Sequence, residues 1–246
     1  AQIGEEFNSL TDRLQTTETL RRRFVSDASH ELKTPLAAIR LLTDSILQTD
    51  QMDMETVRDF VTDIGSEAER LSRITEDLLR LTRLDSDLLD APETVEVAPV
   101  LEQVMRMMSL LAQEKGTELT YRMEENCRVS ATKGEVHQVI YNLTDNAVKY
   151  SGKNGKVRVE LRHEDHDVML TVADNGPGIP EAYRESVFQP FFRVDKSRSR
   201  AHGGVGLGLS LVWEIAALHG GTVQIECSGA DGTVMLVTLP RDGKEA

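Results

Sequence analysis

The chain has 246 residues, 39% hydrophobic and 28% charged, a composition typical of a soluble protein with one or two domains. Its formal net charge of -13 argues against nucleic acid or an anionic membrane as the main partner. No apolar run approaches the roughly 20 residues of a membrane span, and no signal peptide is visible. We therefore expect the chain as given to be soluble, with Cys127 and Cys227 reduced and structural in an intracellular compartment.

The first 48 residues carry apolar side chains at three-and-four spacing, which predicts one helix over about 4–48. Pro35 removes a backbone donor from this helix and should bend it. A polar turn follows at 48–53. The apolar positions of the helix are Ile3, Phe7, Leu10, Leu14, Val25, Ala28, Leu32, Leu36, Ile39, Leu42 and Ile46.

His30 stands two residues after Ala28, so at about 100° per residue it points away from the apolar seam and toward solvent. Glu31 follows it, and Thr34 lies one helical turn further on. A lone exposed histidine on a helix is usually a solvated surface residue. The alternative is a nucleophile that reacts with a group arriving from outside.

A second helix carries a heptad-like apolar seam that ends at Leu84, and the acidic, proline-containing stretch 85–92 predicts a linker. Two antiparallel helices cannot bury both seams by themselves, so we expect two copies of the chain to form a four-helix bundle. The seam consists of Val57, Val61, Ile64, Ala68, Leu71, Ile74, Leu78, Leu81 and Leu84.

Beyond the linker, shorter strands alternate with helices, which predicts a mixed sheet covered by helices on one face. The predicted strands are 94–97, 118–123, 128–130, 156–162, 168–173, 222–227 and 233–239. The predicted helices are 98–115, 133–150 and 207–219.

Two polar motifs lie in this second part of the chain. Asn142, Asn146 and Lys149 share one helix face by their spacing. Amide oxygens can ligate Mg²⁺ and a lysine can neutralise phosphate, although a solvated polar face would look the same. The segment 174–179 (Asp-Asn-Gly-Pro-Gly-Ile) follows a strand. Asp174 can accept a hydrogen bond from an adenine amino group, although these residue types also favour an ordinary turn.

Two further motifs follow. The segment 187–193 (Val-Phe-Gln-Pro-Phe-Phe-Arg) runs into the basic stretch 195–200, whose cations could neutralise phosphate in a mobile loop or lie on an ordinary surface loop. The glycines at 203–208 then precede a helix, and successive glycine N–H groups at a helix N-terminus favour an anion. Their spacing does not match a Walker loop, and the segment 174–179 lacks the spacing and the following helix of a dinucleotide-binding fingerprint.

The segment 29–36 (Ser-His-Glu-Leu-Lys-Thr-Pro-Leu) closely resembles the phosphoacceptor box of bacterial sensor histidine kinases. The four later motifs resemble, in order, the N, G1, F and G2 boxes of their GHKL (Bergerat-type) ATP-binding domain. The resemblance covers nearly the whole chain. It implies a remnant of a HAMP or signalling helix at 1–20, a dimerisation and phosphoacceptor domain at 21–88, and an α/β sandwich at 93–242 that binds ATP.

The resemblance assigns the catalytic roles to His30, Glu31 and Thr34, with Asn146 as the Mg²⁺ ligand. His30 would take the γ-phosphate of Mg-ATP and pass it to an aspartate of a response regulator in trans, and Thr34 would serve a phosphatase activity toward that regulator. The implied nucleotide-binding residues are Asn142, Asn146, Lys149, Tyr150, Asp174, Gly176, Gly178, Ile179, Arg193, Lys196, Gly204, Gly206, Leu207 and Gly208.

The resemblance also implies a lid over the phosphates at about 193–205. Four positions depart from the family pattern, and we expect them to affect only this lid and the packing: Thr132, Glu135, Gln189 and Val205. The homodimer would be the cytoplasmic portion of a bacterial membrane protein, attached to the membrane only through segments that precede residue 1. Two alternatives are another kind of GHKL ATPase and a nucleotide-binding scaffold without kinase activity.

Overall fold

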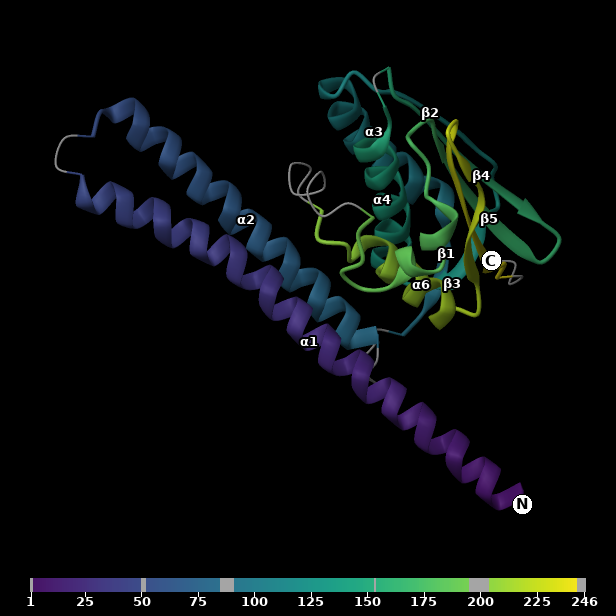
Figure 1. Ribbon diagram of the computed structural model, residues 1–246. Helices are drawn as coiled ribbons and strands as arrows, with labels where there is room; N and C mark the ends of the chain where they lie inside the picture. Colours follow the sequence, from purple (N-terminus) through teal and green to yellow (C-terminus); the bar gives the residue numbers. More distant parts are fainter. Residues whose placement is uncertain (1, 50–51, 85–90, 153, 195–203, 243–246) are drawn as a thin grey trace. The chain divides into compact units, whose positions relative to one another are not determined.

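The computed structural model describes residues 2–49, 52–84, 91–152, 154–194 and 204–242 (Figure 1). It divides into two compact units, Ala1–Leu78 and Leu79–Ala246, which are described one at a time. No helix within the described ranges combines the length and the apolarity that a membrane crossing requires.

The first unit is built from α1 (Gln2–Gln48) and the greater part of α2 (Met54–Leu84). The Asp53 carboxylate accepts hydrogen bonds from the backbone N–H and the hydroxyl of Thr56 (2.9 and 2.8 Å) and so caps the start of α2. Helix α1 continues through Pro35 without interruption. The two predicted helices are confirmed, whereas a bend at Pro35 stays a prediction.

The second unit contains a five-stranded mixed sheet in the order β2-β4-β5-β7-β6. Strands β2 and β4 are parallel, and every other neighbouring pair in this sheet is antiparallel. The strands are β2 (Glu118–Met123), β4 (Lys156–Glu164), β5 (Asp167–Asp174), β6 (Thr222–Gly229) and β7 (Gly232–Pro240).

Helices α3 (Val97–Glu114), α4 (Lys133–Tyr150) and α6 (Gly208–Leu218) cover one face of this sheet (Figure 1). The α/β sandwich predicted from the sequence is confirmed. Strands β1 (Glu93–Glu96) and β3 (Arg128–Ala131) do not join the main sheet but pair antiparallel with each other. Two short 3-10 helices that the sequence pattern does not predict, η1 (Glu181–Tyr183) and η2 (Ser186–Phe188), follow β5.

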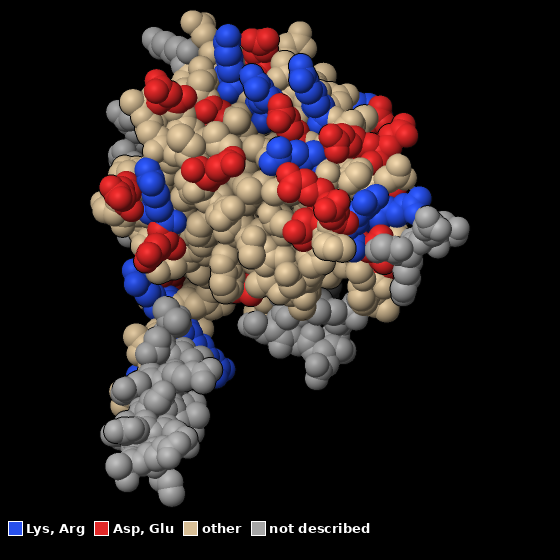
Figure 2. All heavy atoms as spheres, turned by 90° about the vertical axis from the view of Figure 1, so that its right-hand side faces the viewer, with Lys and Arg blue, Asp and Glu red and all other residues tan. Residues whose placement is uncertain are grey.

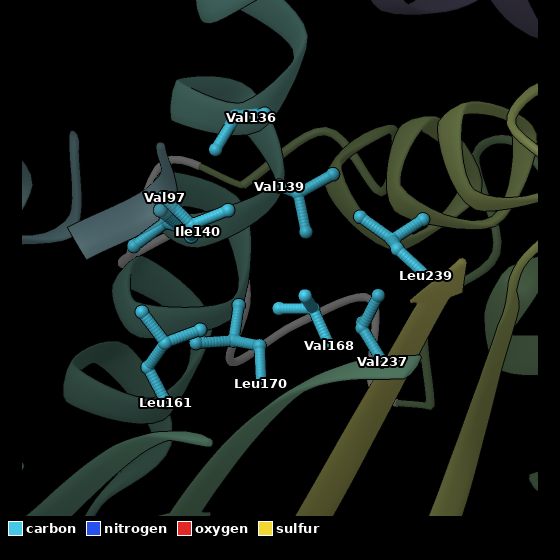
Figure 3. A pocket seen from close by; sticks show the side chains of 9 residues that line it. All are labelled: Val97, Val136, Val139, Ile140, Leu161, Val168, Leu170, Val237 and Leu239. Atoms are coloured by element: carbon cyan, nitrogen blue, oxygen red, sulfur yellow. The ribbon is translucent and has the colours of Figure 1, made fainter. Parts of the chain in front are cut away.

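The core of the second unit lies between the helices and the sheet. Alternate residues of β4 (Val157, Val159 and Leu161) are buried, as a strand with one covered face requires. Burying one such side chain contributes about 1.5–3 kcal/mol. The packing leaves an apolar cavity of about 20 Å³ (Figure 3). Its lining residues are Val97, Val136, Val139, Ile140, Leu161, Val168, Leu170, Val237 and Leu239.

Charged side chains on the strand side of the second unit include both signs. Figure 2 shows Lys and Arg intermingled with Asp and Glu on this side rather than gathered in a patch of one sign. Two of the ion pairs on the strands join Lys156 to Glu118 and Arg158 to Glu160, each over 3.9 Å. This face therefore lacks the basic stripe typical of nucleic-acid-binding proteins.

Candidate functional site

His30 is exposed on α1, as its position relative to the apolar seam predicts. Among the described residues, none forms a hydrogen bond or ion pair with its imidazole. The Thr34 hydroxyl donates to the carbonyl oxygen of His30 over 3.2 Å. Both Thr34 and the ring of His30 therefore lie where a molecule from solvent can reach them.

Glu31 takes a different position from its neighbour because consecutive side chains on a helix do not face each other. It is half-buried, and its carboxylate lies 3.5 Å from the guanidinium of Arg70 on α2. Arg70 also lies 3.5 Å from Glu67. The carboxylate thus joins the two helices of the first unit and is not held against the imidazole of His30.

Helix α4 carries the first group of predicted nucleotide residues. Its N-terminus is fixed by a capping box, in which Thr132 accepts from the N–H of Glu135 and the Glu135 carboxylate accepts from the N–H of Thr132. Asn142 is buried and uses both ends of its amide within the protein. Asn146, one turn on, is half-buried, and no described residue bonds to its amide.

The last turn of α4 holds a cluster of charges. Lys149 Nζ lies 2.6 Å from Asp145 Oδ2, a pair at i,i+4 spacing. Lys115, just beyond α3, donates to the carbonyl oxygens of Val148 and Lys149 (3.1 and 2.7 Å). Burial lowers the pKa of Lys115. These contacts satisfy carbonyls that the end of a helix leaves without partners, and they hold Lys149 at the end of α4.

Asp174 is the last residue of β5, and its Oδ1 accepts from the backbone N–H of Gly176 over 2.7 Å. Burial raises the pKa of this carboxyl, and backbone hydrogen bonds from Gly176 and Thr233 oppose that rise. Any side chain at Gly176 would collide with the carbonyl oxygen of Tyr150. The turn at 174–179, called the Asp174 turn below, thus requires glycine at position 176 to pass this close to α4.

Gly178 and Ile179 continue this turn and contact the β6–β7 hairpin. Gly178 has a φ of +73°, and a Cβ there would overlap the carbonyl oxygen of Gly229. The N–H of Ile179 donates to Ser228 Oγ over 2.6 Å. The hairpin therefore supports the turn that follows β5.

The third and fourth motifs meet through their backbones. The N–H of Phe191 donates to the carbonyl oxygen of Gly206 over 2.9 Å. Gly206 has a φ of +85°, and a Cβ there would lie 2.7 Å from the carbonyl oxygen of Phe192. Leu207 is buried, and its carbonyl oxygen accepts from Leu211 N–H at the start of α6. This arrangement places residues 204–207, called the glycine turn below, directly before the N-terminus of α6. Backbone N–H groups at a helix N-terminus favour anions.

Tyr150 lies beside this glycine turn. Its hydroxyl is 3.9 Å from the position that a Cβ of Gly204 would take. Burial raises the pKa of Tyr150, and the nearby charge of Arg193 opposes that rise. The structure thus brings Tyr150, Arg193 and Gly204 together, whereas Lys196 lies outside the described residues.

The residues present fit a nucleotide with a hard cation, but they do not form a metal site of their own. Within the described part of the chain, no three His, Cys, Asp or Glu side chains come together in a way that could hold a metal ion. Asn146 offers one amide oxygen to which no described residue bonds. Mg²⁺ keeps several waters and is commonly bound through few protein ligands together with substrate phosphates. That donor set is consistent with an ion that arrives with a nucleotide.

Several contributors to this site were missed from the sequence. Ser228 and Thr233 support the Asp174 turn from the hairpin, and Asp145 and Lys115 hold Lys149. Only the Asp145–Lys149 spacing of four residues gave a usable signal. The other contacts join segments far apart in the chain.

Two family models together match most of the chain. The model for "Histidine kinase-, DNA gyrase B-, and HSP90-like ATPase" matches residues 131–243, and "His Kinase A (phospho-acceptor) domain" matches residues 20–87. The probable sensor histidine kinase TcrY of Mycobacterium tuberculosis is 37% identical over 253 residues, which cover 98% of the chain and 52% of TcrY. The chain belongs to the sensor histidine kinase family. It spans about half the length of this relative.

Solved histidine kinases share the fold. Full-length ShkA in complex with AMPPNP is 27% identical, with a TM-score of 0.67 over 92% of the chain and 47% of ShkA. ThkA in complex with response regulator protein TrrA is 22% identical, with a TM-score of 0.71 over 94% of the chain and 66% of ThkA. At that identity ThkA shows the fold alone.

Proposed function

We propose that the chain is the core of an ATP-dependent protein-histidine kinase that transfers the γ-phosphate of ATP to His30. The observation that carries this proposal is an exposed imidazole to which no described residue bonds, in the matched phosphoacceptor segment of a chain whose second unit has a histidine kinase ATPase fold. The complex of the related ShkA with AMPPNP supports ATP as the phosphoryl donor.

Phosphoryl transfer requires the protein mainly to position the His30 imidazole and the γ-phosphate and to neutralise charge. In the proposed step, one ring nitrogen of His30 forms a bond to the γ-phosphorus while the bond to the ADP oxygen breaks. The other ring nitrogen then loses its proton, for which Glu31 is the proposed acceptor. Glu31 can act in this way only after its carboxylate turns from Arg70 toward the imidazole.

The nucleotide would lie between α4, the Asp174 turn and the glycine turn. Asp174 would accept from the adenine amino group, and Gly204, Gly206, Leu207 and Gly208 would surround the phosphates. Tyr150, Lys149 and Arg193 would add a hydroxyl and two positive charges. Asn146 is the proposed protein ligand of Mg²⁺, which would neutralise phosphate charge and orient the γ-phosphate.

Dimerisation is supported by apolar positions of the first unit that remain exposed in a single chain. Val25, Leu36 and Val61 belong to the predicted seams, yet they are 57%, 58% and 55% exposed. Monomeric soluble proteins seldom leave such a stripe uncovered. A second copy of the chain is the proposed partner, through a four-helix bundle.

A response regulator in trans is the proposed acceptor of the phosphoryl group, and phosphatase activity toward it is the proposed second role. Thr34 would orient the attacking water. Thr34→Ala should lower phosphatase activity at least tenfold while phosphorylation of His30 remains. Thr43→Ala is the matched control, because the Thr43 hydroxyl also donates to a carbonyl four residues back, that of Ile39. Equal phosphatase activity of the two variants would exclude this role.

Attachment to a membrane is proposed only through segments that precede residue 1, which would make this chain the cytoplasmic portion of a bacterial membrane protein. The proposed kinase is tested by incubation with γ-labelled Mg-ATP. We expect label on the wild-type chain and almost none on Asn146→Ala. A wild-type chain that binds ATP without taking up label would instead favour the nucleotide-binding scaffold, and ATP hydrolysis without a labelled chain would favour another GHKL ATPase.

A further inference from the structure

Two side-chain amides connect the middle of α4 to the first residue of α6. Gln138 Nε2 donates to Asn142 Oδ1 over 3.1 Å, and Asn142 Nδ2 donates to the carbonyl oxygen of Gly208 over 3.2 Å. Gln138 and Asn142 are only 9% and 8% exposed. Because water has little access to them, these bonds are strong and leaving one unmade is costly.

The Gly208 carbonyl decides which group donates and which accepts in these two hydrogen bonds. The Gly208 carbonyl can only accept, so Asn142 must turn its NH₂ toward it and its oxygen toward Gln138. Gln138 must then present its own NH₂, while its Oε1 accepts from Arg80 Nη1. The orientation of both amides follows from the hydrogen-bond network, and a donor at position 138 is needed to keep it.

Gly208 is where the glycine turn becomes helix α6. A Cβ at Gly208 would lie 3.5 Å from Asn142 Cγ and Oδ1, so the Asn142 amide packs directly against this residue. The amide therefore braces the glycine turn against α4. Because its oxygen already accepts from Gln138, Asn146 is the amide of α4 that remains free for a metal ion among the described residues.

We propose that Gln138 is a positioning residue of the nucleotide site. It orients the Asn142 amide, which holds the turn from Gly206 to Gly208 in the shape that receives the triphosphate. Gln138 acts through Asn142 and does not touch the nucleotide. This inference rests on the proposed function, since it requires that the glycine turn binds phosphates.

Two substitutions of similar length separate positioning from simple filling of the core. Gln138→Met removes the donor to Asn142 Oδ1 and also the acceptor of Arg80. Gln138→Glu keeps an acceptor for Arg80 but places an oxygen against Asn142 Oδ1, so the ionised carboxylate should disturb Asn142 more than methionine does. A protonated carboxyl has an O–H that can donate, so acid strong enough to overcome the preference of Arg80 for the ionised form should restore the bond in Gln138→Glu alone.

The test measures AMPPNP affinity of the full 246-residue chain by calorimetry, at slightly alkaline pH and at the most acidic pH at which the wild-type chain stays folded. We expect about tenfold weaker binding for Gln138→Met at both pH values. Gln138→Glu should bind still more weakly at alkaline pH and approach wild type in acid. Wild-type affinity in both variants, or equal losses that do not change with pH, would overturn the proposal.

A second measurement needs no nucleotide and keeps this inference distinct from the proposed function. Hydrogen exchange at the amide of Leu211, which donates to the Leu207 carbonyl oxygen, should be faster in Gln138→Met, while exchange in β4 and β5 stays unchanged. If the wild-type chain bound no AMPPNP but exchange responded, the proposed function would fail and the brace between α4 and α6 would stand. Unchanged exchange at the Leu211 amide would reject the brace, even in an active kinase.

Discussion

The Asp174 carboxylate accepts a hydrogen bond from the backbone N–H of Gly176 over 2.7 Å, at the point where β5 turns toward the β6–β7 hairpin. Burial raises the pKa of Asp174 above the usual value of an aspartate, despite the opposing hydrogen bonds from Gly176 and Thr233. The carboxylate is thus oriented by the turn but partly deprived of solvent. Both properties suit an acceptor for an adenine amino group.

The affinity for an ATP analogue should therefore depend on the ionisation of Asp174. A ligand that donates a hydrogen bond to the carboxylate binds the ionised form better, so affinity is full above the pKa of Asp174 and falls below it. Because this pKa is raised, the loss should begin at a higher pH than for an ordinary aspartate. Calorimetric titration over the acid range measures it.

Asp174→Asn is the matched variant, because it replaces one carboxylate oxygen with NH₂ at the same size. It should bind at least tenfold more weakly near neutral pH and lose the acid-dependent step. Titration curves with the same pH dependence in wild type and Asp174→Asn would contradict a role for this carboxylate in binding adenine.

Gly178→Ala should destabilise the second unit and weaken nucleotide binding. Its φ of +73° is unfavourable for alanine by about 1–2 kcal/mol, and the added Cβ would overlap Gly229. The expected loss in the free energy of unfolding is about 2 kcal/mol or more, measured by urea unfolding. In α2, Gly65→Ala meets no atom within 4 Å and should instead stabilise the helix by about 1 kcal/mol. If Gly178→Ala lowered the free energy of unfolding no more than Gly65→Ala does, the close approach of Gly178 to Gly229 would be contradicted.

Glu135 should contribute to stability in a pH-dependent way. His219 Nε2 lies 3.1 Å from its carboxylate. Burial by itself would raise the pKa of Glu135, but hydrogen bonds from His219 and Thr132 outweigh burial and lower it. A carboxyl whose pKa is depressed on folding adds stability that is present above its unfolded pKa and lost as pH falls through its folded pKa.

Glu135→Gln should consequently be less stable than wild type near neutral pH, by about 1 kcal/mol, and the difference should shrink in acid. Urea unfolding at a series of pH values measures this. Since Glu160 is also a half-buried glutamate and shows no such bond to a histidine, Glu160→Gln is the control variant. A pH-independent difference for Glu135→Gln would reject the ionic contribution.

Val168→Ile should stabilise the second unit, because Val168 points into the apolar cavity between α4 and the sheet (Figure 3). Filling such a cavity commonly adds about 0.5–2 kcal/mol. Val172 lies four residues along β5, is 1% exposed and does not line the cavity. Val172→Ile should therefore destabilise through overpacking. Equal changes in melting temperature would show that the cavity cannot accept the added methylene.

The order and type of the main elements could be predicted from sequence because their signals are local. The apolar periodicity of α1 and α2 follows the helical repeat, and the alternation of Val157, Val159 and Leu161 follows from one covered face of β4. The pairing of β1 with β3 could not be predicted, since either strand could equally join the main sheet.

The residues of the candidate site also divide into those with a local sequence signal and those that depend on contacts between distant segments. Asp174, Asn146 and the glycines were proposed as site residues from motifs, but the support of the Asp174 turn by Ser228 depends on a contact across 49 residues of sequence. Thr132 and Glu135 were noted only as departures from the family pattern. Their capping box could have been found from the Thr-x-x-Glu spacing, whereas the contact of Glu135 with His219 could not.

The most direct test of the proposed kinase asks which residue takes the label from γ-labelled Mg-ATP. His30→Gln is compared with His166→Gln, which alters an exposed histidine in the turn between β4 and β5. We predict label that is acid-labile and base-stable in wild type and in His166→Gln, and its loss in His30→Gln. Label that persists in His30→Gln, or that is stable in acid, would contradict phosphorylation of His30.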